Sequence, residues 1–344
     1  EITDFQGHSL KVQPIRYRRE GCYYAIFAED IPPMGYKTFE IVFKQPSTDT
    51  GTITINNASI ENHFYKLQLN PDKGTIQSLY DKELNCELVD SSSPWELGAF
   101  IYEKLGNRDQ LAQYRLDDYN RTGLSECRII DSSNGPIYQR ILLQGKSPGT
   151  DEAFGVNLEI KLYHDTKRIE LEYAIKRLPE TDPSGIYVAF PFQLPEGKLA
   201  FDVQGGTVIS GKNQLEGTST DWNTVQNFVS VQNNQAQIII GSSLIPLYQL
   251  GDINLGKFQY QKQYERPHVY SWVMNNYWNT NFKASQEGEF RWSYHLTSSV
   301  DPSNNLATKF GWSSRIPLYA RVMPTGTENH KPTEYSAFHF EKDN

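Results

Sequence analysis

Hydrophobic and polar residues alternate with a period of two along much of the chain. Between residues 169 and 176, Ile, Leu, Tyr and Ile occupy the odd positions, whereas the even positions hold mainly Glu or Lys. Residues 290–297 repeat the alternation with aromatic residues and leucine on one face. This period predicts antiparallel strands that are buried on one side. No long amphipathic helix is expected, and residues 109–119 form at most one short helical piece.

Turn-forming residues separate the predicted strands. Clusters of Pro, Gly, Asn and Asp occur at residues 71–74, 133–136, 183–185, 205–206 and 233–234. These residues favour tight reversals of the backbone, each through its own conformational preference. Together with the alternation, they predict an all-β protein.

The chain is predicted to have three parts. Residues 1–47 contain strands near 10–17 and 22–27, which are too few to bury a two-layer core. They therefore look like the last strands of a small β-sandwich. After a polar linker, residues 48–324 form a large β-domain, and residues 325–344 add a closing strand and a tail.

Composition and charge narrow the class of protein. Among 344 residues, 33 Lys and Arg oppose 41 Asp and Glu, giving a net charge of −8. This balance argues against nucleic acid as a partner, because phosphate binding needs clustered cations. No apolar run approaches the roughly 20 residues that cross a bilayer, so we expect a soluble protein without a membrane partner. The compartment, whether secreted, periplasmic or cytoplasmic, stays open.

The remaining composition agrees with this picture. Aromatic residues make up 13% of the chain, a content that suits a pleated surface. The three cysteines form no CxxC pair and predict neither a disulfide framework nor a zinc site. The sequence starts at Glu1 without Met or an apolar leader, so we expect either a processed protein or a fragment.

Motifs for independent catalysis are weak. The seven histidines lack metal-ligand spacing, and no Ser lies in a GxSxG elbow. Gly145-Lys146-Ser147 resembles the end of a P-loop, but Arg140 stands where its first glycine belongs. Asp117 and Asp118 are neighbours that point to opposite faces of a strand. The sequence therefore predicts no catalytic residue and no cofactor or metal in this chain.

The most informative stretch is 271–282, with the sequence SWVMNNYWNTNF. Asn amides match vicinal hydroxyls, and Trp or Tyr faces stack on the C–H faces of a pyranose. The stretch thus offers a sugar-binding interpretation. Alternatively, Trp272 and Trp278 anchor a core and the asparagines bond to turns, which the chemistry alone favours.

Residues 272–282, together with Gln286-Glu287-Gly288, resemble a signature in the C-terminal part of glycoside hydrolase family 38, the retaining α-mannosidases. Other segments resemble family positions in the same order; they are residues 31–38, 60–64, 72–82, 187–195, 221–226 and 243–247. Several motifs in one order are more specific than any single motif.

The resemblance implies a large β-supersandwich similar to that of galactose mutarotase. It further implies that an α/β barrel and a helical bundle, both missing here, supply the nucleophile, the acid/base carboxylate and a zinc ion. Such enzymes act by double displacement. This chain would then be inactive alone, support the barrel of the same polypeptide, and line outer subsites for α-mannoside glycans.

The resemblance also implies that a tyrosine from this region reaches the sugar. Tyr102 is the best positional candidate, with Tyr80 and Tyr114 as alternatives, and the matching arginine is not assigned. Sugar-binding candidates from both lines of reasoning are Tyr102, Asn275, Asn276, Tyr277, Trp278 and Asn281.

Two other functions stay open. A free-standing epimerase of the mutarotase type needs a His acid and a Glu base, for which His164 and His295 are strand candidates. A non-catalytic carbohydrate-binding module would instead need an exposed row of Tyr and Trp. Neither the linkage preference nor the oligomeric state follows from the sequence.

Overall fold

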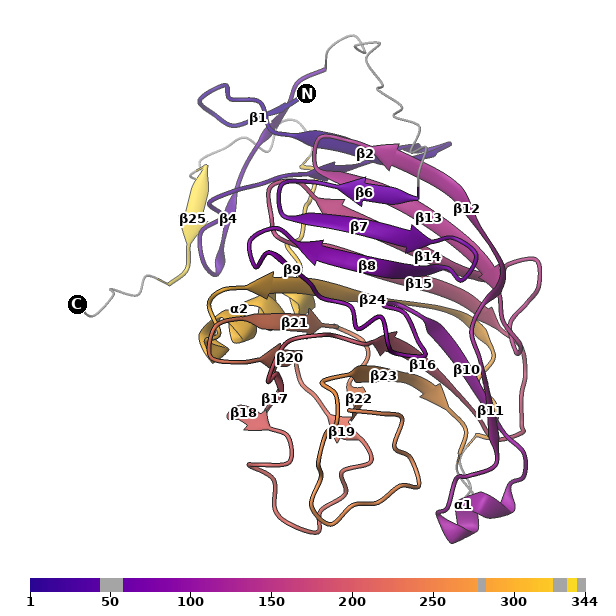
Figure 1. Ribbon diagram of the computed structural model, residues 1–344. Coiled ribbons are helices and arrows are strands. Elements are labelled where there is room, and N and C mark those ends of the chain that lie inside the picture. Colours follow the sequence, from indigo (N-terminus) through magenta and orange to yellow (C-terminus); the bar gives the residue numbers. More distant parts are fainter. Residues whose placement is uncertain (44–57, 278–282, 324–332, 339–344) are drawn as a thin grey trace. The chain divides into compact units, whose positions relative to one another are not determined.

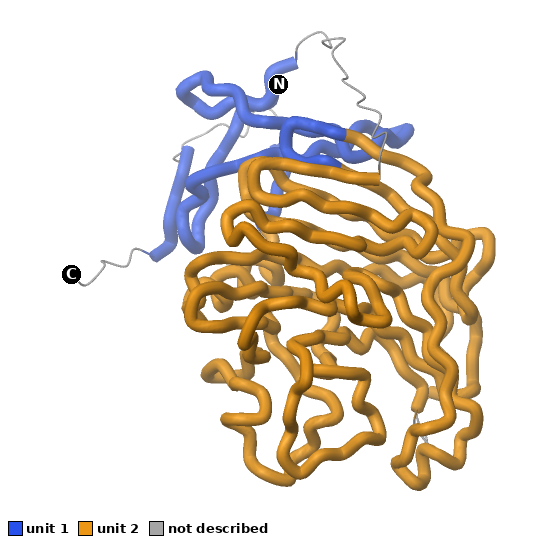
Figure 2. Tube along the Cα trace, in the orientation of Figure 1, with its two compact units in different colours: residues 1–53, 134–139, 318–344 blue, residues 54–133, 140–317 orange. Residues whose placement is uncertain are grey.

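The computed structural model describes residues 1–43, 58–277, 283–323 and 333–338. The chain divides into two compact units (Figure 2). Unit 1 comprises residues 1–53, 134–139 and 318–344, and unit 2 comprises residues 54–133 and 140–317. The strands are antiparallel wherever their pairing is described, and helices are few. The prediction of an all-β protein with large antiparallel sheets is therefore confirmed.

Unit 1 is made of three short antiparallel pairs. β2 (Val12–Arg18) pairs with β3 (Gly21–Ile26), close to the predicted hairpin. β1 (Ile2–Thr3) pairs with β5 (Glu40–Ile41), and β25 (Glu334–Ser336) pairs with β4 (Gly35–Lys37). The side chain of Gln13 is hydrogen bonded to the backbone of Ile137 and Tyr138, which ties β2 to the turn at 134–139. Residues 334–336 of the tail thus form a strand.

The largest sheet of unit 2 has nine strands (Figure 1). In spatial order they are β12 (Ser125–Asn134), β13 (Tyr138–Lys146), β14 (Val156–Tyr163), β15 (Ile169–Arg177), β24 (Gly288–Ser299), β21 (Gln237–Gly241), β20 (Phe228–Gln232), β17 (Lys198–Val203) and β18 (Gly206–Ile209). β15 and β24 are the two stretches whose alternation is clearest in the sequence. They pair over nine residues, from Ile169 opposite Leu296 to Arg177 opposite Gly288.

Two smaller sheets complete unit 2. The first has six strands, in the order β11 (Tyr119–Thr122), β10 (Phe100–Leu105), β16 (Ser184–Phe190), β23 (Val269–Asn275), β22 (Leu247–Leu250) and β19 (Asn223–Thr224). The second has four strands, in the order β6 (Ser59–Glu61), β7 (Tyr65–Asn70), β8 (Thr75–Asp81) and β9 (Cys86–Glu87).

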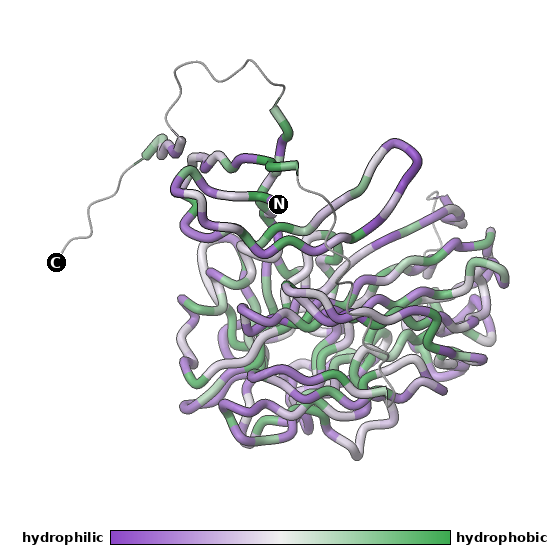
Figure 3. The backbone as a smooth tube through the Cα atoms, turned by 90° about the horizontal axis from the view of Figure 1, so that it is seen from above, coloured by the Kyte–Doolittle hydropathy of each residue, from purple (hydrophilic) through white to green (hydrophobic). Residues whose placement is uncertain are grey.

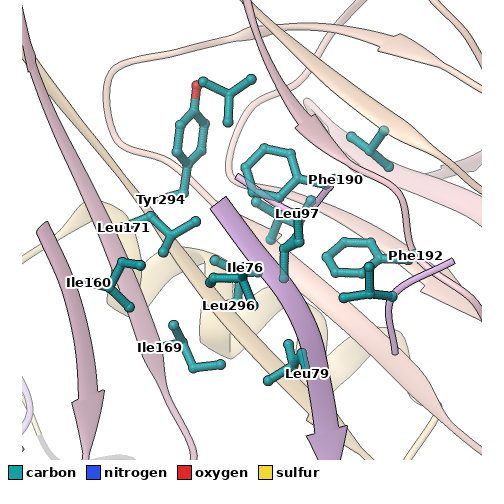
Figure 4. Packing of buried hydrophobic residues seen from close by; sticks show 14 of the residues in the cluster. Ile76, Leu79, Leu97, Ile160, Ile169, Leu171, Phe190, Phe192, Tyr294 and Leu296 are labelled. Atoms are coloured by element: carbon teal, nitrogen blue, oxygen red, sulfur yellow. The ribbon is translucent and has the colours of Figure 1, made fainter. Parts of the chain in front are cut away.

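One continuous core joins the three sheets. Figure 4 shows Ile76 and Leu79 of β8 beside Ile169 and Leu171 of β15 and other buried side chains of the cluster. Along the strands, hydrophobic and hydrophilic positions alternate (Figure 3). Because a one-residue slip would turn the apolar side chains outward, this alternation fixes the register of the sheets.

The predicted turns agree with the structure at most positions. The four residues 71–74 connect β7 to β8, and Gly74 takes a left-handed conformation with φ +65° that favours glycine. The pair at 205–206 and the pair at 233–234 also lie at hairpins. The turn expected at 183–185 is wrong, because β16 already begins at Ser184 and is buried throughout.

Two helices are present in the described residues. α1 (Asp109–Gln113) is the short piece that the sequence predicted. α2 (Asn304–Arg315) was not predicted. Its buried face consists of Ala307, Gly311 and Ser314, and Gly311 packs closely on Asn227 and Phe228. Leu306 and Phe310 pack beside them at helical spacing, so the helical pattern is present but is interrupted by small and polar residues.

Candidate functional site

The stretch that carried the sugar-binding hypothesis runs along β23 and just beyond its end. Trp272 and Tyr277 are buried, with 4% and 6% of their surface exposed. Both pack on the face of the six-stranded sheet that points away from the main core. Asn275 is the last residue of β23, and its Oδ1 has no hydrogen-bond partner among the described residues. Trp278 and Asn281 lie outside the described residues.

Asn276 connects three segments of backbone. Its Oδ1 accepts hydrogen bonds from the backbone N–H of Ser184 at 2.6 Å and from the Ser184 hydroxyl at 3.0 Å. Its Nδ2 donates to the carbonyls of Glu180, Asp182 and Ala284 at 3.1, 2.7 and 3.3 Å. This amide therefore holds the loops around the start of β16 in place.

A buried carboxylate lies at the centre of the same face. Glu103, in β10, is 2% exposed and pairs in register with Arg121 of β11. Arg121 Nε donates to Glu103 Oε2, while Glu103 Oε1 accepts from the hydroxyls of Tyr277 at 2.6 Å and Tyr187 at 3.2 Å. We call Glu103, Arg121, Tyr187 and Tyr277 the Glu103 cluster.

The electrostatics of the Glu103 cluster keep its donors protonated. Burial raises the pKa of both Tyr187 and Tyr277 well above the usual value, and the adjacent Glu103 charge raises it further. Burial lowers the pKa of Arg121, but the charge and hydrogen bond of Glu103 outweigh this, so the net shift is upward. The carboxylate thus faces three donors, and Arg121 also lies 4.1 Å from the centre of the Tyr119 ring.

Aromatic rings surround the Glu103 cluster. The rings of Tyr187 and Trp272 are stacked, with centroids 6.1 Å apart and an interplanar angle of 5°. Trp272 also contacts Tyr277 and, edge to face, Trp222. The face therefore combines an aromatic wall with a charged pair, both buried, and the hydrogen bonds of the pair are made within the chain.

Tyr102 lies on the opposite face of β10, because successive residues of a strand alternate. It is 4% exposed, and the Arg177 guanidinium lies 6.0 Å from the centre of its ring. Arg177 Nη2 donates to the Ser184 hydroxyl at 2.9 Å, and its buried Nη1 has no partner among the described residues. The structure thus places Arg177 beside Tyr102, and a role of either residue in sugar binding stays a prediction.

The alternative tyrosines have other partners. Tyr80 donates to Asn85 Oδ1 at 2.6 Å, and Tyr114 donates to Asp221 Oδ2 at 2.9 Å. Neither hydroxyl is hydrogen bonded to an arginine in the part of the chain that the structure describes.

The two histidine candidates for epimerase chemistry lie on different strands and have different surroundings. His164 follows β14, whereas His295 lies within β24 with its Nδ1 4.0 Å from Glu170 Oε2. Burial is the main reason that the pKa of His295 falls to about 4. Glu170 is hydrogen bonded to Lys161 at 2.9 Å and to Tyr163 at 2.8 Å. A neutral histidine beside an occupied carboxylate makes a poor acid/base pair near neutral pH.

Sequence reasoning missed Glu103, Arg121 and Tyr187. One signal was available in the sequence: Glu103 directly follows the apolar run 97–102. A charged residue in such a place is buried only when it is paired. Its partner could not be identified, because the pairing of Glu103 with Arg121 depends on the register of β10 and β11.

Neither a metal-binding group of side chains nor a membrane-spanning helix is found in the described ranges. Within them, no group of three or more His, Cys, Asp or Glu side chains is placed to bind a metal ion. The helices in these ranges are all too short or too polar to cross a bilayer.

Comparison with known proteins identifies the family. Two solved structures from Enterococcus faecalis are similar in fold, each with 13% identity over 92% of this chain. One is described as a protein in the glycosyl hydrolase family 38, with a TM-score of 0.64, and the other as an α-mannosidase, with a TM-score of 0.65. The chain spans only 41% and 40% of their lengths. No curated protein matches it by sequence. Residues 60–259 match the family model of the glycosyl hydrolases family 38 C-terminal domain, so the chain belongs to this family.

Proposed function

We propose that this chain is the C-terminal β-sandwich part of a retaining, zinc-dependent α-mannosidase. The observation that carries the proposal is the family match over residues 60–259. The similarity in fold to the α-mannosidase of Enterococcus faecalis supports it. The nucleophile, the acid/base carboxylate and the zinc ligands would belong to a catalytic barrel in the same polypeptide, and this chain would contribute no catalytic residue.

In this proposal the chain has two tasks. It supports the barrel, and it lines the outer sugar subsites with Tyr102, Asn275, Asn276, Tyr277, Trp278 and Asn281. Of the described members, Asn275 has an acceptor without a partner at the end of β23, whereas Tyr277 and Asn276 are hydrogen bonded within the chain. Asn275 is therefore the member whose side chain the described chain leaves with an unpaired acceptor, although that oxygen is buried.

Unit 1 offers apolar surface for the supporting task. Ile15 and Tyr17 of β2 and Tyr23 and Tyr24 of β3 are each at least 50% exposed. Exposed apolar side chains gathered on one hairpin are typical of a protein contact. We propose that they pack against the remainder of the polypeptide.

Hydrolysis of p-nitrophenyl α-D-mannopyranoside tests the proposal. The chain alone should be inactive. The polypeptide that includes the proposed barrel should hydrolyse the substrate with retention, lose activity with a chelator, and regain it with zinc. A folded, zinc-loaded enzyme that cleaves no α-mannoside, or one that retains full activity in the chelator, would refute the proposal.

A substitution tests the outer subsites. In the active enzyme, Asn275→Ala should raise KM for an α-mannotriose without changing kinetics on the small aryl mannoside, since only the longer substrate reaches these subsites. Asn120→Ala, at an exposed residue of β11, is the matched control. Equal effects on both substrates would place Asn275 outside the outer subsites.

One measurement separates the proposal from the epimerase alternative. Freshly dissolved α-D-galactose and α-D-mannose can be followed by proton NMR in the presence of this chain. We expect the anomers to interconvert at the buffer rate. Faster interconversion would favour a self-sufficient epimerase instead.

A further inference from the structure

Two long loops of unit 2 enclose a small polar cavity. The first loop, residues 210–222, follows β18, and the second, residues 251–268, joins β22 to β23 (Figure 1). The cavity has a volume of about 300 Å³ and its walls include Gln214, Thr220 and Lys262. This volume is at the lower end of the range for small-molecule sites, about 300–1,000 Å³.

Lys262 is an unusual residue for a cavity wall. It is only 7% exposed. Its ammonium lies 5.6 Å from the centre of the Tyr264 ring, and no hydrogen-bond acceptor or carboxylate contacts it within the described part of the chain. The ammonium itself is not fully buried, so it faces the cavity without an anionic partner from the described chain.

The carboxylates near Lys262 already have other partners. Asp252 pairs with Lys257 at 3.2 Å. Asp221 Oδ2 accepts from the Tyr114 hydroxyl at 2.9 Å and from the backbone N–H of Gly256 at 3.1 Å. Glu216, in the cavity wall, accepts from Gln261 at 2.9 Å. Asp252 and Glu216 are thus paired with other residues, and Asp221, whose buried Oδ1 has no hydrogen-bond partner among the described residues, forms no ion pair with Lys262 there.

Electrostatics agree with this geometry. Burial lowers the pKa of Lys262, and the charges of Asp221 and Asp252 offset only part of this effect. A second cation, Lys212, also lines the cavity, so its walls carry two ammonium groups against the single carboxylate of Glu216. The cavity is therefore suited to an anionic group.

The remaining walls suit hydroxyl groups and a ring. Thr220, Gln261 and Gln263 provide polar side chains, and the Tyr260 ring offers an aromatic face. The first loop is held in shape by Gln214, whose Oε1 accepts from Gly211 N and whose Nε2 donates to Asn223 Oδ1, at 3.1 and 3.0 Å. The site is therefore already formed before a ligand binds.

We propose that this cavity binds a sugar-sized, hydroxylated molecule that carries one oxyanion, with the oxyanion placed against Lys262. A carboxylate or a phosphate ester would supply the same chemistry. The inference goes beyond the proposed function and does not depend on it, because it is drawn from the cavity and from Lys262 alone.

Isothermal titration calorimetry of this chain tests the proposal with four probes: sodium D-glucuronate, D-glucose 6-phosphate, D-glucose and sodium sulfate. We expect one or both sugar acids to bind more tightly than D-glucose and sulfate. The preference between the two acids tells a carboxylate site from a phosphate site. Failure of both acids, or equally tight binding of D-glucose or of bare sulfate, would overturn the proposal.

Variants assign the binding to Lys262. Lys262→Met should weaken the sugar acid at least tenfold, whereas Lys262→Arg, which keeps the charge, should retain most of the affinity. Lys198→Met removes the same charge from an exposed residue of β17 and should leave binding unchanged. Unchanged affinity in Lys262→Met would overturn the proposal. Cooperative unfolding of each variant, followed by fluorescence, shows that a loss of binding is not a loss of fold.

Discussion

Glu103 and Lys262 are two of the charged residues that unit 2 buries near aromatic rings, and their surroundings differ. Glu103 accepts hydrogen bonds from Arg121, Tyr187 and Tyr277. Lys262 is almost as buried, yet the carboxylates around it bind other residues. The difference separates two roles for a buried charge. A charge with all its partners within the chain stabilises one arrangement of strands, whereas a charge left at a cavity wall is available to a ligand.

The largest effect is expected from breaking the Glu103 cluster. Arg121→Met leaves the Glu103 carboxylate buried without its cation, which should cost about 3–5 kcal/mol in the free energy of unfolding. All six tryptophans belong to unit 2, so urea unfolding followed by tryptophan fluorescence reports on this unit.

Two controls make this result specific. Arg115→Met removes an exposed arginine that pairs with Asp117, and should cost less than about 1 kcal/mol. Adding Glu103→Gln to Arg121→Met should recover part of the lost stability. A loss below about 1 kcal/mol in Arg121→Met would mean that the pair does not hold β10 and β11 together.

His295 is another buried titratable residue of unit 2, and its protonation makes stability depend on pH. Its pKa falls from 6.5 to about 4 because of burial, so the folded state binds a proton less readily than the unfolded chain. Stability should therefore decrease as the pH falls through the window from 6.5 to 4. By linkage the loss between pH 7 and pH 5 is about 2 kcal/mol.

A His295→Gln variant isolates this contribution. The pKa of Glu170 is lowered from 4.5, so its own contribution is lost only below that value and leaves pH 5–7 to the histidines. His268 remains in both proteins, with its ring 2.9 Å from Asp90. The variant should show a shallower decrease in the free energy of unfolding over this range, and equal slopes would contradict the prediction.

The sequence predicted the fold where one side of a strand is buried. Residues 169–176 and 290–297 alternate cleanly, and both form central strands of the nine-stranded sheet. It did not predict α2. Leu306 and Phe310 pack there at helical spacing, but the helix is short and its most buried positions are small or polar, namely Ala307, Gly311 and Ser314.

The candidate sites were harder to predict for a different reason. Tyr277 and the asparagines beside it were found from local composition, but Glu103 and Arg121 meet only through strand register. Lys262 gives no local signal, because only the folded loops show that Asp252 pairs with Lys257 and that Asp221 accepts from Tyr114 and Gly256. Which tyrosine reaches the sugar stays a prediction.

A smaller effect is expected from the two phenols of the Glu103 cluster. Tyr277→Phe removes a hydrogen bond of 2.6 Å to a buried carboxylate, which should cost about 1.5–3 kcal/mol. Tyr187→Phe removes the longer bond of 3.2 Å and should cost less, about 1 kcal/mol. The same fluorescence assay ranks the two variants. The reverse order would mean that Tyr187 is the main donor.

The smallest effect is expected from Lys262, and its sign is opposite. Lys262→Met removes an unpaired ammonium but keeps the packing of its aliphatic chain, so the unliganded protein should become more stable by about 1 kcal/mol. Lys198→Met, on the surface, should change stability by less than about 0.5 kcal/mol. The contrast between Glu103 and Lys262 predicts opposite effects on stability. Breaking the paired charge of Glu103 should destabilise the protein, whereas removing the unpaired charge of Lys262 should not. If Lys262→Met destabilises the protein as Arg121→Met does, then Lys262 contributes to the fold, and the free charge in the cavity is not held for a ligand.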